Sequence, residues 1–397
     1  MPVDVHTARA ETLFRPQFAL VCVYSLATTL AAGTLLPVLP LYVRGPLDGG
    51  DVAVGLVMSG ALLVGALAQP IFGRLADRRG RRLLLLGGPL VFSSFVALFA
   101  FASDPATLFA LRAAAGVGDA ACIVGSVTMI NDLAPDSRRG EAYSLYSLAA
   151  WAGLGLGPVI GDFVHRASSF DAVWVVAIAL SLSGAALAVA LPETRPQITR
   201  SRPAFAFLSR YAAVPGAVIA LEMFGFAALV VFSPLYAREL GMQGAGLVLL
   251  VNAAVLVAMR VLGRRLPDRV GPRRAASAGV LLAAGGIGLA AVLGSPAGLY
   301  LGAAVFGAGH ALLYPALFLL AVGRAPEDER SAALGSLKAL EGLGFAFAAA
   351  FIGLTASLGG YGVAFGVAAV ITATGLIPLR VFLPRTRLER PALKFDD

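Results

Sequence analysis

The chain has 397 residues, of which 58% are hydrophobic and only 14% are charged, whereas an average soluble domain carries about 25% charged residues. This composition, with a mean hydropathy of +0.83, excludes an ordinary soluble domain and predicts an all-α integral membrane protein. The formal charge of +8 would also fit a nucleic-acid-binding protein. Most of the basic residues, however, fall in segments that we place on one side of the membrane, so the positive balance reflects topology.

Apolar runs of about 20 residues, the length that crosses a bilayer core, recur along the whole chain. The first run is too long for the core of a signal peptide, so we expect it to be retained as a helix. An even number of spans places both termini on the same side. We predict twelve membrane-spanning helices, near residues 17–43, 52–75, 82–103, 106–131, 140–165, 171–191, 208–237, 243–266, 274–294, 297–323, 331–358 and 361–383.

The stretch Gly73–Arg82 carries five arginines and one aspartate between the second and third apolar runs. We interpret it as a loop. Translocating so many cations is unfavourable, and the positive-inside rule therefore assigns this stretch to the cytoplasmic side. Both termini are then cytoplasmic, and we expect a multi-pass protein of the cell's inner (plasma) membrane.

A weaker copy of this stretch lies at Leu266–Arg274, displaced by roughly half the chain, which indicates a duplicated half. The segment between the halves is rich in Pro, Arg and Ser and has no apolar run, so it reads as a linker that lets two bundles move. We predict a cytoplasmic tail at 1–16, a six-helix bundle at 17–191, a cytoplasmic linker at 192–207, a second six-helix bundle at 208–383 and a cytoplasmic tail at 384–397.

The spacing within the first stretch resembles the loop that joins helices 2 and 3 of the major facilitator superfamily of secondary transporters. The matching positions are Gly73, Asp77, Arg78, Gly80, Arg81 and Arg82, and their counterparts in the copy are Asp268, Arg269 and Gly271. The resemblance implies two pseudo-symmetric six-helix bundles and a cytoplasmic gate. In that gate Asp77 would lie near the amino-terminal end of helix 11, around Arg330–Leu334, where the helix dipole favours an anion.

Two further stretches carry the resemblance. The fourth helix reads RAAAGVGDAA from Arg112, and the fifth reads GLGLGPVIG from Gly153, similar to the helix-5 motif of the drug and proton antiporter branch. Glycines four residues apart share one helix face and let a neighbouring helix approach closely, while the proline kinks the helix. Asp162 stands where the motif usually ends on a glycine. The motif residues are Gly153, Gly157, Pro158 and Gly161.

Ionisable residues within the spans are the candidates for proton coupling and for lining a substrate cavity. They are Arg112, Asp119, Glu222, His310, Lys338 and Glu341. A charge at the bilayer centre costs roughly 2.5–3.5 kcal/mol, so each must pair, become neutral or face a polar cavity. Arg112 and Asp119 share a helix face about 10 Å apart, and Lys338 and Glu341 are neighbours at i and i+3. Either pair could be a structural clasp, and His310 could instead bond Tyr314 one turn away.

Exporters of the family often place an acidic residue in helix 1, which this chain lacks. We therefore expect Asp119 and Glu222 to carry the proton, because a carboxyl group in an apolar cavity can alternate between a proton and a cationic substrate. If neither does, Lys338 and Glu341 are the next candidates.

Three classes of function remain to be compared. The favoured one is a secondary transporter working by alternating access, which exports small amphipathic or drug-like molecules in exchange for protons. A facilitator or exporter of a sugar or other polar metabolite is the alternative, although the spans are poor in Asn and Gln. A receptor or enzyme is disfavoured, because no nucleotide loop or nucleophile–base constellation is visible. We expect a monomer with no cofactor, metal or nucleic-acid partner; Cys22 and Cys122 lie in apolar spans and indicate no disulfide.

Overall fold

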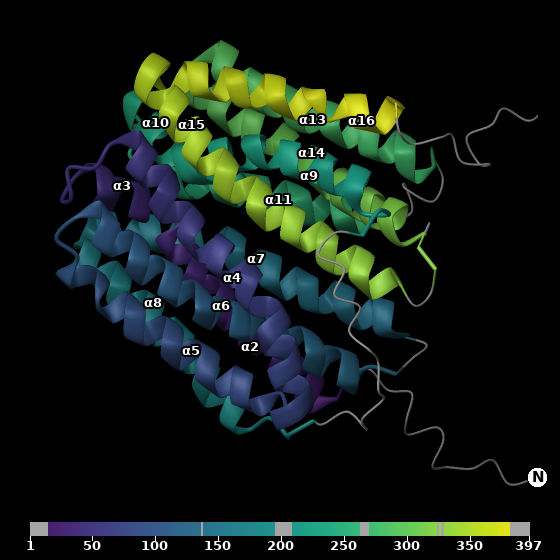
Figure 1. The fold of residues 1–397 in the computed structure, drawn as a ribbon. Coiled ribbons are helices and arrows are strands. Elements are labelled where there is room, and N and C mark those ends of the chain that lie inside the picture. Colours follow the sequence, from purple (N-terminus) through teal and green to yellow (C-terminus); the bar gives the residue numbers. More distant parts are fainter. Residues whose placement is uncertain are drawn as a thin grey trace, which may run out of the picture.

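The computed structural model describes residues 15–135, 138–194, 209–262, 270–323, 325–326 and 329–381. Every regular element in these ranges is helical, and Figure 1 shows the helices side by side in two groups, purple to teal and teal to yellow. Ten of the described helices are long and apolar enough to cross a membrane. The prediction of an all-α, multi-pass membrane protein is confirmed.

The first group begins with a helix that breaks near Pro37, because proline lacks the N–H that would continue the hydrogen-bond ladder. Later helices start at side-chain caps, such as Asp104, whose Oδ1 accepts the N–H groups of Ala106 and Thr107, both at 2.9 Å. The helices are α2 (Pro16–Leu35), α3 (Leu39–Arg44), α4 (Asp51–Arg79), α5 (Arg82–Ala97), α6 (Pro105–Leu133), α7 (Arg139–Ala167) and α8 (Phe170–Val189).

The stretch Gly73–Arg82 is mostly helical, so the prediction of a loop was wrong for most of its length. Helix α4 continues to Arg79 and α5 begins at Arg82. Arginine is a good helix former, and its long side chain can reach the aqueous phase from a helix end. The chain turns only at Gly80, whose φ of 98° suits glycine.

The second group has the same plan with a different first helix. A π-helical segment, η3 (Ala228–Phe232), separates α9 (Ala213–Ala227) from α10 (Ser233–Glu239). Helix α15 contains a non-helical residue, Gly360, with φ 81° and ψ 172°, between the two spans predicted there. This break, together with the shorter α11, makes the structure compatible with twelve crossings. The remaining helices are α11 (Gly246–Leu262), α13 (Pro272–Leu293), α14 (Pro296–Val322), α15 (Arg330–Thr374) and α16 (Leu376–Val381).

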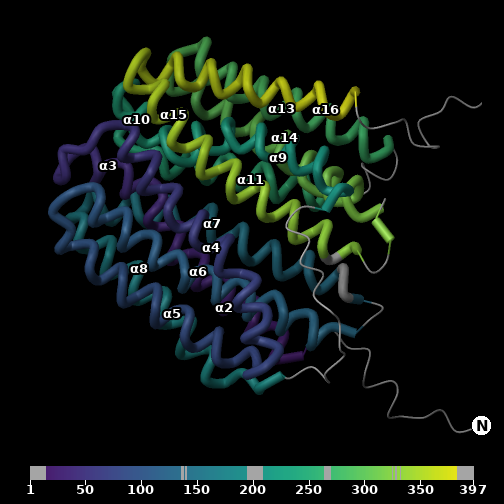
Figure 2. The backbone as a smooth tube through the Cα atoms, in the orientation of Figure 1, coloured from purple at the N-terminus to yellow at the C-terminus, as the bar shows by residue number. Residues whose placement is uncertain are grey.

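The same helix pairings recur in both groups. In the first, α2 packs on α7 and α8, α4 on α6, and α5 on α6 and α8. In the second, α9 packs on α15 and α16, α11 on α14, and α13 on α14 and α15. The groups meet along two seams, α4 with α15 and α7 with α11, which can be followed in Figure 2. This repetition is the pseudo-symmetry that the duplicated sequence predicts, while the bundle limits 17–191 and 208–383 stay predictions.

Glycines bring helices together both within and between the groups. A Cβ atom at Gly157 of α7 would lie 2.7 Å from the Cα atom of Gly33 in α2, so the helix-5 motif packs on helix 1. On the seam between the groups, a Cβ atom at Gly55 of α4 would lie 2.6 Å from the backbone carbon of Ala349 in α15. Such contacts leave no room for a side chain, and they allow dispersion contacts along whole helix faces.

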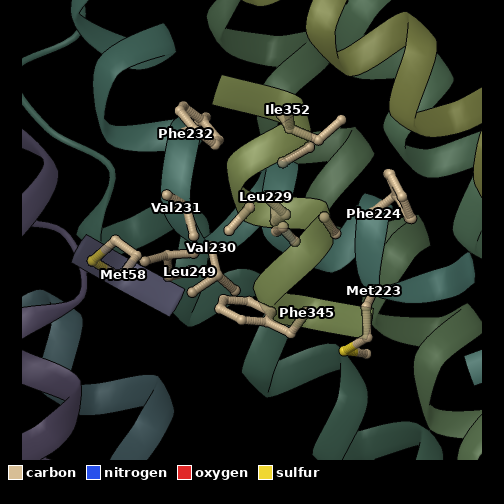
Figure 3. Packing of buried hydrophobic residues seen from close by; sticks show 14 of the residues in the cluster. Met58, Met223, Phe224, Leu229, Val230, Val231, Phe232, Leu249, Phe345 and Ile352 are labelled. Carbon is tan, nitrogen blue, oxygen red and sulfur yellow. The ribbon is translucent and has the colours of Figure 1, made fainter. Parts of the chain in front are cut away.

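The molecule has two ends that are used as reference points below. The arginine-rich end carries Gly73–Arg82, and the opposite end carries α3 and α10, which contact each other (Figure 1). One buried apolar cluster includes Met58 of α4, Val230 of η3, Leu249 of α11 and Phe345 of α15 (Figure 3). The two groups therefore share one core.

Candidate functional site

At the arginine-rich end, Arg81 is the centre of a polar network. Its side chain is buried, and its Nε donates to Asp132 Oδ2 of α6 at 2.8 Å. Its Nη1 lies 3.2 Å from Asp77 Oδ1, and its backbone N–H donates to Glu193 Oε1 at 2.7 Å. Arg82 adds a bond from Nη2 to the carbonyl oxygen of Val189 at 2.6 Å. The stretch predicted to form the gate therefore joins α4, α6 and the segment after α8.

Two glycines hold equivalent turns at this end. A Cβ atom at Gly80 would overlap the Glu193 carboxylate, and Gly271, which precedes α13, also has a positive φ, 85°. Gly73 has no neighbouring atoms at its Cβ position, and Arg78 is exposed. Asp268 and Arg269 lie outside the described residues.

Asp77 has a different environment from its neighbour Arg81. Its side chain is 64% exposed, and its ion pair is with Arg81 on the same stretch. The expected contact with the start of α15 is not among the polar contacts of the described residues and stays a prediction.

Within α6, Arg112 and Asp119 form an ion pair. Arg112 Nη1 lies 3.4 Å from Asp119 Oδ2, with the Arg112 side chain buried and that of Asp119 25% exposed. The shared face was predicted, but the separation of about 10 Å was wrong for the charged groups. It applies to the backbone, and the long arginine side chain spans the two turns.

Glu222 of α9 and His310 of α14 are brought together across the second group. Glu222 Oε1 lies 2.9 Å from His310 Nδ1, and both side chains are buried, Glu222 with 1% exposure. The His310 ring stacks on Phe226 at a centroid distance of 5.5 Å and meets Trp151 edge-on at 5.7 Å. The alternative bond from His310 to Tyr314 was wrong, because the nearby carboxylate is its partner.

Lys338 and Glu341 of α15 pair as predicted from their spacing. Lys338 Nζ lies 3.0 Å from Glu341 Oε2, and the Tyr314 hydroxyl donates to the same oxygen at 3.2 Å. Next to them lies Arg260 of α11, with its guanidinium carbon 5.2 Å from the ring centroid of Trp151. Arg260 was not predicted to be a site residue, although its position inside a predicted span was a usable signal.

At the opposite end, Asp51 was also missed as a site residue. Its carboxylate is buried at the start of α4, 3.3 Å from Arg44 Nε. The Tyr361 hydroxyl donates to its Oδ1 at 2.9 Å. Since Tyr361 follows the break in α15, this bond joins the two helix groups.

Asp162 makes the second connection at that end. Its buried Oδ2 accepts the backbone N–H of Gly246, the first residue of α11, at 3.1 Å, and lies 3.7 Å from Arg166 Nη2. A cavity of about 330 Å³ beside it is also lined by Gln243 and Tyr300. The departure of Asp162 from the helix-5 motif was the signal in the sequence that could have identified this contact.

Two helix groups with the same internal pairings form an architecture from which many membrane transporters are built. The family model described as Major Facilitator Superfamily matches the chain over residues 21–285 and 216–396. The chain belongs to this superfamily, whose members are transporters rather than enzymes and generally need no cofactor.

Curated relatives support this assignment, and solved structures show the same fold. An uncharacterized MFS-type transporter of Salmonella typhimurium is 27% identical over 96% of this chain and 99% of its own length. Another from Burkholderia mallei is 26% identical over 93% and 92% of the two chains. The fold is similar to that of human organic anion transporter MFSD10, with TM-score 0.69, 20% identity, and coverage of 92% and 100%. It is also similar to a variant of the nucleoside transporter NupG, with TM-score 0.77, 13% identity, and coverage of 93% and 100%.

Proposed function

We propose that this protein is a secondary active transporter that exports small amphipathic or drug-like molecules in exchange for protons, by alternating access. The observation that carries the proposal is the buried Glu222–His310 pair, held at 2.9 Å inside the second helix group. With a neutral imidazole the pair has one negative charge, and binding one proton removes it. Because membrane burial disfavours net charge, such a pair is suited to take up and release a proton as its access to water changes.

The Arg112–Asp119 pair supports the same proposal from the first helix group. Asp119 is partly exposed while its partner is buried, so the carboxylate can exchange a proton while the arginine keeps its charge. The close packing of the helix-5 motif on α2 favours the drug and proton antiporter branch. Relatives in bacteria favour an inner-membrane location, with the arginine-rich end and both termini in the cytoplasm. We propose a monomer.

The proposal includes a gate at the arginine-rich end. The exposed Asp77 side chain would exchange its Arg81 partner for the amino-terminal end of α15 when the arginine-rich end closes, because the dipole at a helix start attracts an anion. Asp51 and Asp162 hold the opposite end together in the conformation described above. Exchange between these two sets of contacts would produce alternating access.

A transporter of a polar metabolite is the second candidate. The two solved structures of similar fold are named as an organic anion transporter and a nucleoside transporter, and these names support a polar substrate as the second candidate. A susceptibility panel of drugs and metabolites, in a host with and without the gene, separates the two candidates. Protection against amphipathic drugs favours export of such molecules, and a response confined to sugars or nucleosides favours the alternative.

Coupling is tested in proteoliposomes with a substrate from that panel. Glu222→Gln and Asp119→Asn should each lose accumulation driven by a pH gradient and keep passive exchange, because the substitutions remove the titrating proton and retain shape. Glu239→Gln, an exposed change at the last residue of α10, is the matched control and should behave as wild type. If both test variants still accumulate substrate, neither residue carries the proton, and Lys338 with Glu341 must be tested next.

A further inference from the structure

Arg260 of α11 differs in its partners from the residues predicted to carry coupling. Asp119, Glu222 and Glu341 each have a cationic or imidazole partner within 3.4 Å, and Arg112 and Lys338 are the cations of two of those pairs. Arg260 instead bonds the Ser147 hydroxyl through Nη1 at 3.3 Å. Its buried Nε has no hydrogen-bond partner, and no carboxylate of the described residues lies within ion-pair distance. Within the described part of the chain, this permanent cation therefore has no ion-pair partner.

Aromatic rings surround this cation. Its guanidinium carbon lies 5.2 Å from the centroid of Trp151 and 5.9 Å from that of Tyr314, and Lys338 Nζ lies 4.8 Å from the same tyrosine ring. These residues come from α7, α11, α14 and α15. On α7, α14 and α15 they lie about two to three turns from the helix end nearest the arginine-rich end. Arg260 lies close to the last described residue of α11, Leu262. We call Ser147, Trp151, Arg260, Tyr314, Lys338 and Glu341 the Arg260 cluster.

The cluster carries a surplus positive charge. It contains two cations, Arg260 and Lys338, against the single carboxylate of Glu341, which Lys338 and Tyr314 already bind at 3.0 and 3.2 Å. Cation–π contacts with Trp151 and Tyr314 offset only part of the cost of holding a guanidinium within a membrane span. A ligand that brings one negative charge would neutralise the surplus. Arg260 and the half-exposed Lys338 both lie against the Tyr314 ring, and both are donors to anionic groups.

We infer that the Arg260 cluster binds an amphipathic organic anion, with a carboxylate or sulfonate between Arg260 and Lys338 and an apolar ring against Trp151. The inference rests on the proposed function, since it names the substrate class of the transport path. It favours an anion over the cationic substrate expected from Asp119 and Glu222, because both of those carboxylates already have partners. Trp151 lies on one helix group and Arg260 on the other, so the ligand would bind where the two groups meet.

Binding to purified protein in lipid nanodiscs tests this directly, with three probes that share one ring system. They are 1-naphthoate, neutral 1-naphthamide and 1-naphthylmethylammonium, each measured by equilibrium dialysis. Hydrogen bonds to charged groups are among the strongest in proteins, so wild type should bind the naphthoate about tenfold more tightly than the amide. The ammonium probe should bind most weakly. Equal affinity for all three probes would overturn the inference.

Variants distinguish an anion site from a structural contact between α7 and α11. Arg260→Gln should abolish the preference for the naphthoate, and Arg260→Lys should retain part of it. Glu341→Gln should act in the opposite direction and tighten naphthoate binding, because it removes the competing carboxylate; a merely structural cluster would not give opposite signs. Arg210→Gln removes a positive charge from an exposed site outside the cluster and should leave the preference unchanged.

Size-exclusion chromatography identifies variants that do not fold. If Arg260→Gln does not fold, Lys338→Gln tests the anion site in its place. The Lys338 side chain is 51% exposed, so its replacement should leave the fold intact, and it should reduce the preference for the naphthoate severalfold. An unchanged preference in whichever variant folds contradicts the anion site. Equilibrium binding needs no pH gradient, so it tests the anion site independently of proton coupling. If the protein prefers the naphthoate but shows no proton-driven transport, only the coupling proposal is overturned. Proton-driven transport without the preference would overturn the anion site alone.

Discussion

The two ends of the molecule use the same type of residue in different ways. At the opposite end, Asp51 and Asp162 are buried, and each accepts a hydrogen bond from the other helix group, from Tyr361 and Gly246 respectively. At the arginine-rich end, Asp77 is exposed and pairs with Arg81 of its own group. At the opposite end, Asp162 thus contacts the start of a helix, α11, of the other group. At the arginine-rich end, Asp77 makes no such contact among the described residues, but its exposed side chain could form one. We therefore expect closure of each end to depend on which donor its aspartate binds.

The largest effect on transport is expected from replacing Asp77. Asp77→Asn should abolish transport while leaving the protein folded in the membrane, because the neutral side chain is only weakly attracted to the start of α15. Uptake of substrate into inverted vesicles and the size-exclusion profile measure the two parts of this prediction. Asp171→Asn, an exposed change in the first turn of α8, is the matched control and should transport normally. Normal transport by Asp77→Asn would rule out the gating role.

A second effect concerns the close packing of α4 against α15. Gly55→Val places atoms against the backbone of Ala349 and should destabilise the protein by about 1–3 kcal/mol, as overpacking usually does. Gly335→Val of α15 has open space at its Cβ position and should be tolerated. Thermal unfolding in detergent compares the variants. Equal melting temperatures would show that the seam is not tightly packed near Gly55.

A smaller effect is expected from weakening the bond at the start of α11. Asp162→Asn keeps an oxygen that can accept the Gly246 N–H but removes the charge, which should cost about 1–2 kcal/mol. The population open at the opposite end should then rise by a factor of roughly 5 to 30. Distances between spin labels across that end report the shift, after Cys22 and Cys122 are replaced. Asp171→Asn again provides the control, and an unchanged distance distribution would show that Asp162 does not hold this end closed.

The smallest effect concerns Asp104, which caps α6 outside the membrane-spanning segment. Hydrogen bonds from Thr107 lower the pKa of this carboxyl group. Its contribution to stability is therefore present above the pKa of the unfolded chain and is lost as the pH falls through the lower folded-state pKa. Asp104→Ala should lower the melting temperature slightly at neutral pH and remove that pH dependence. Because the Asp104 cap lies within one helix and does not connect the two helix groups, the spin-label distances across the opposite end should stay constant.

Contacts within one helix were largely predictable, and contacts between helices were not. The spacing of Lys338 and Glu341, and the shared face of Arg112 and Asp119, follow from helix geometry alone. The Glu222–His310 bond joins residues 88 positions apart, and it depends on how α9 docks against α14. No local periodicity specifies that arrangement.

The gate stretch shows a different limit. Its charge predicted a loop, but charge reports which side of the membrane a segment faces and not its backbone conformation. Helix propensity favoured continuing α4 to Arg79, and only Gly80 supplied the conformation that ends it. The contact of Asp162 with α11 likewise needed the tertiary structure, although the missing glycine at that position was visible in the sequence.

The polypeptide between the two helix groups is fastened at both of its ends. Glu193 accepts the Arg81 N–H, and Thr194 donates to Asp132 at 2.8 Å on one side. On the other side, the Ser209 N–H donates to Ser336 Oγ of α15 at 2.8 Å. Each helix group therefore holds its own end of this polypeptide, and neither set of bonds crosses from one group to the other, whereas the contacts of the α4–α15 and α7–α11 seams do.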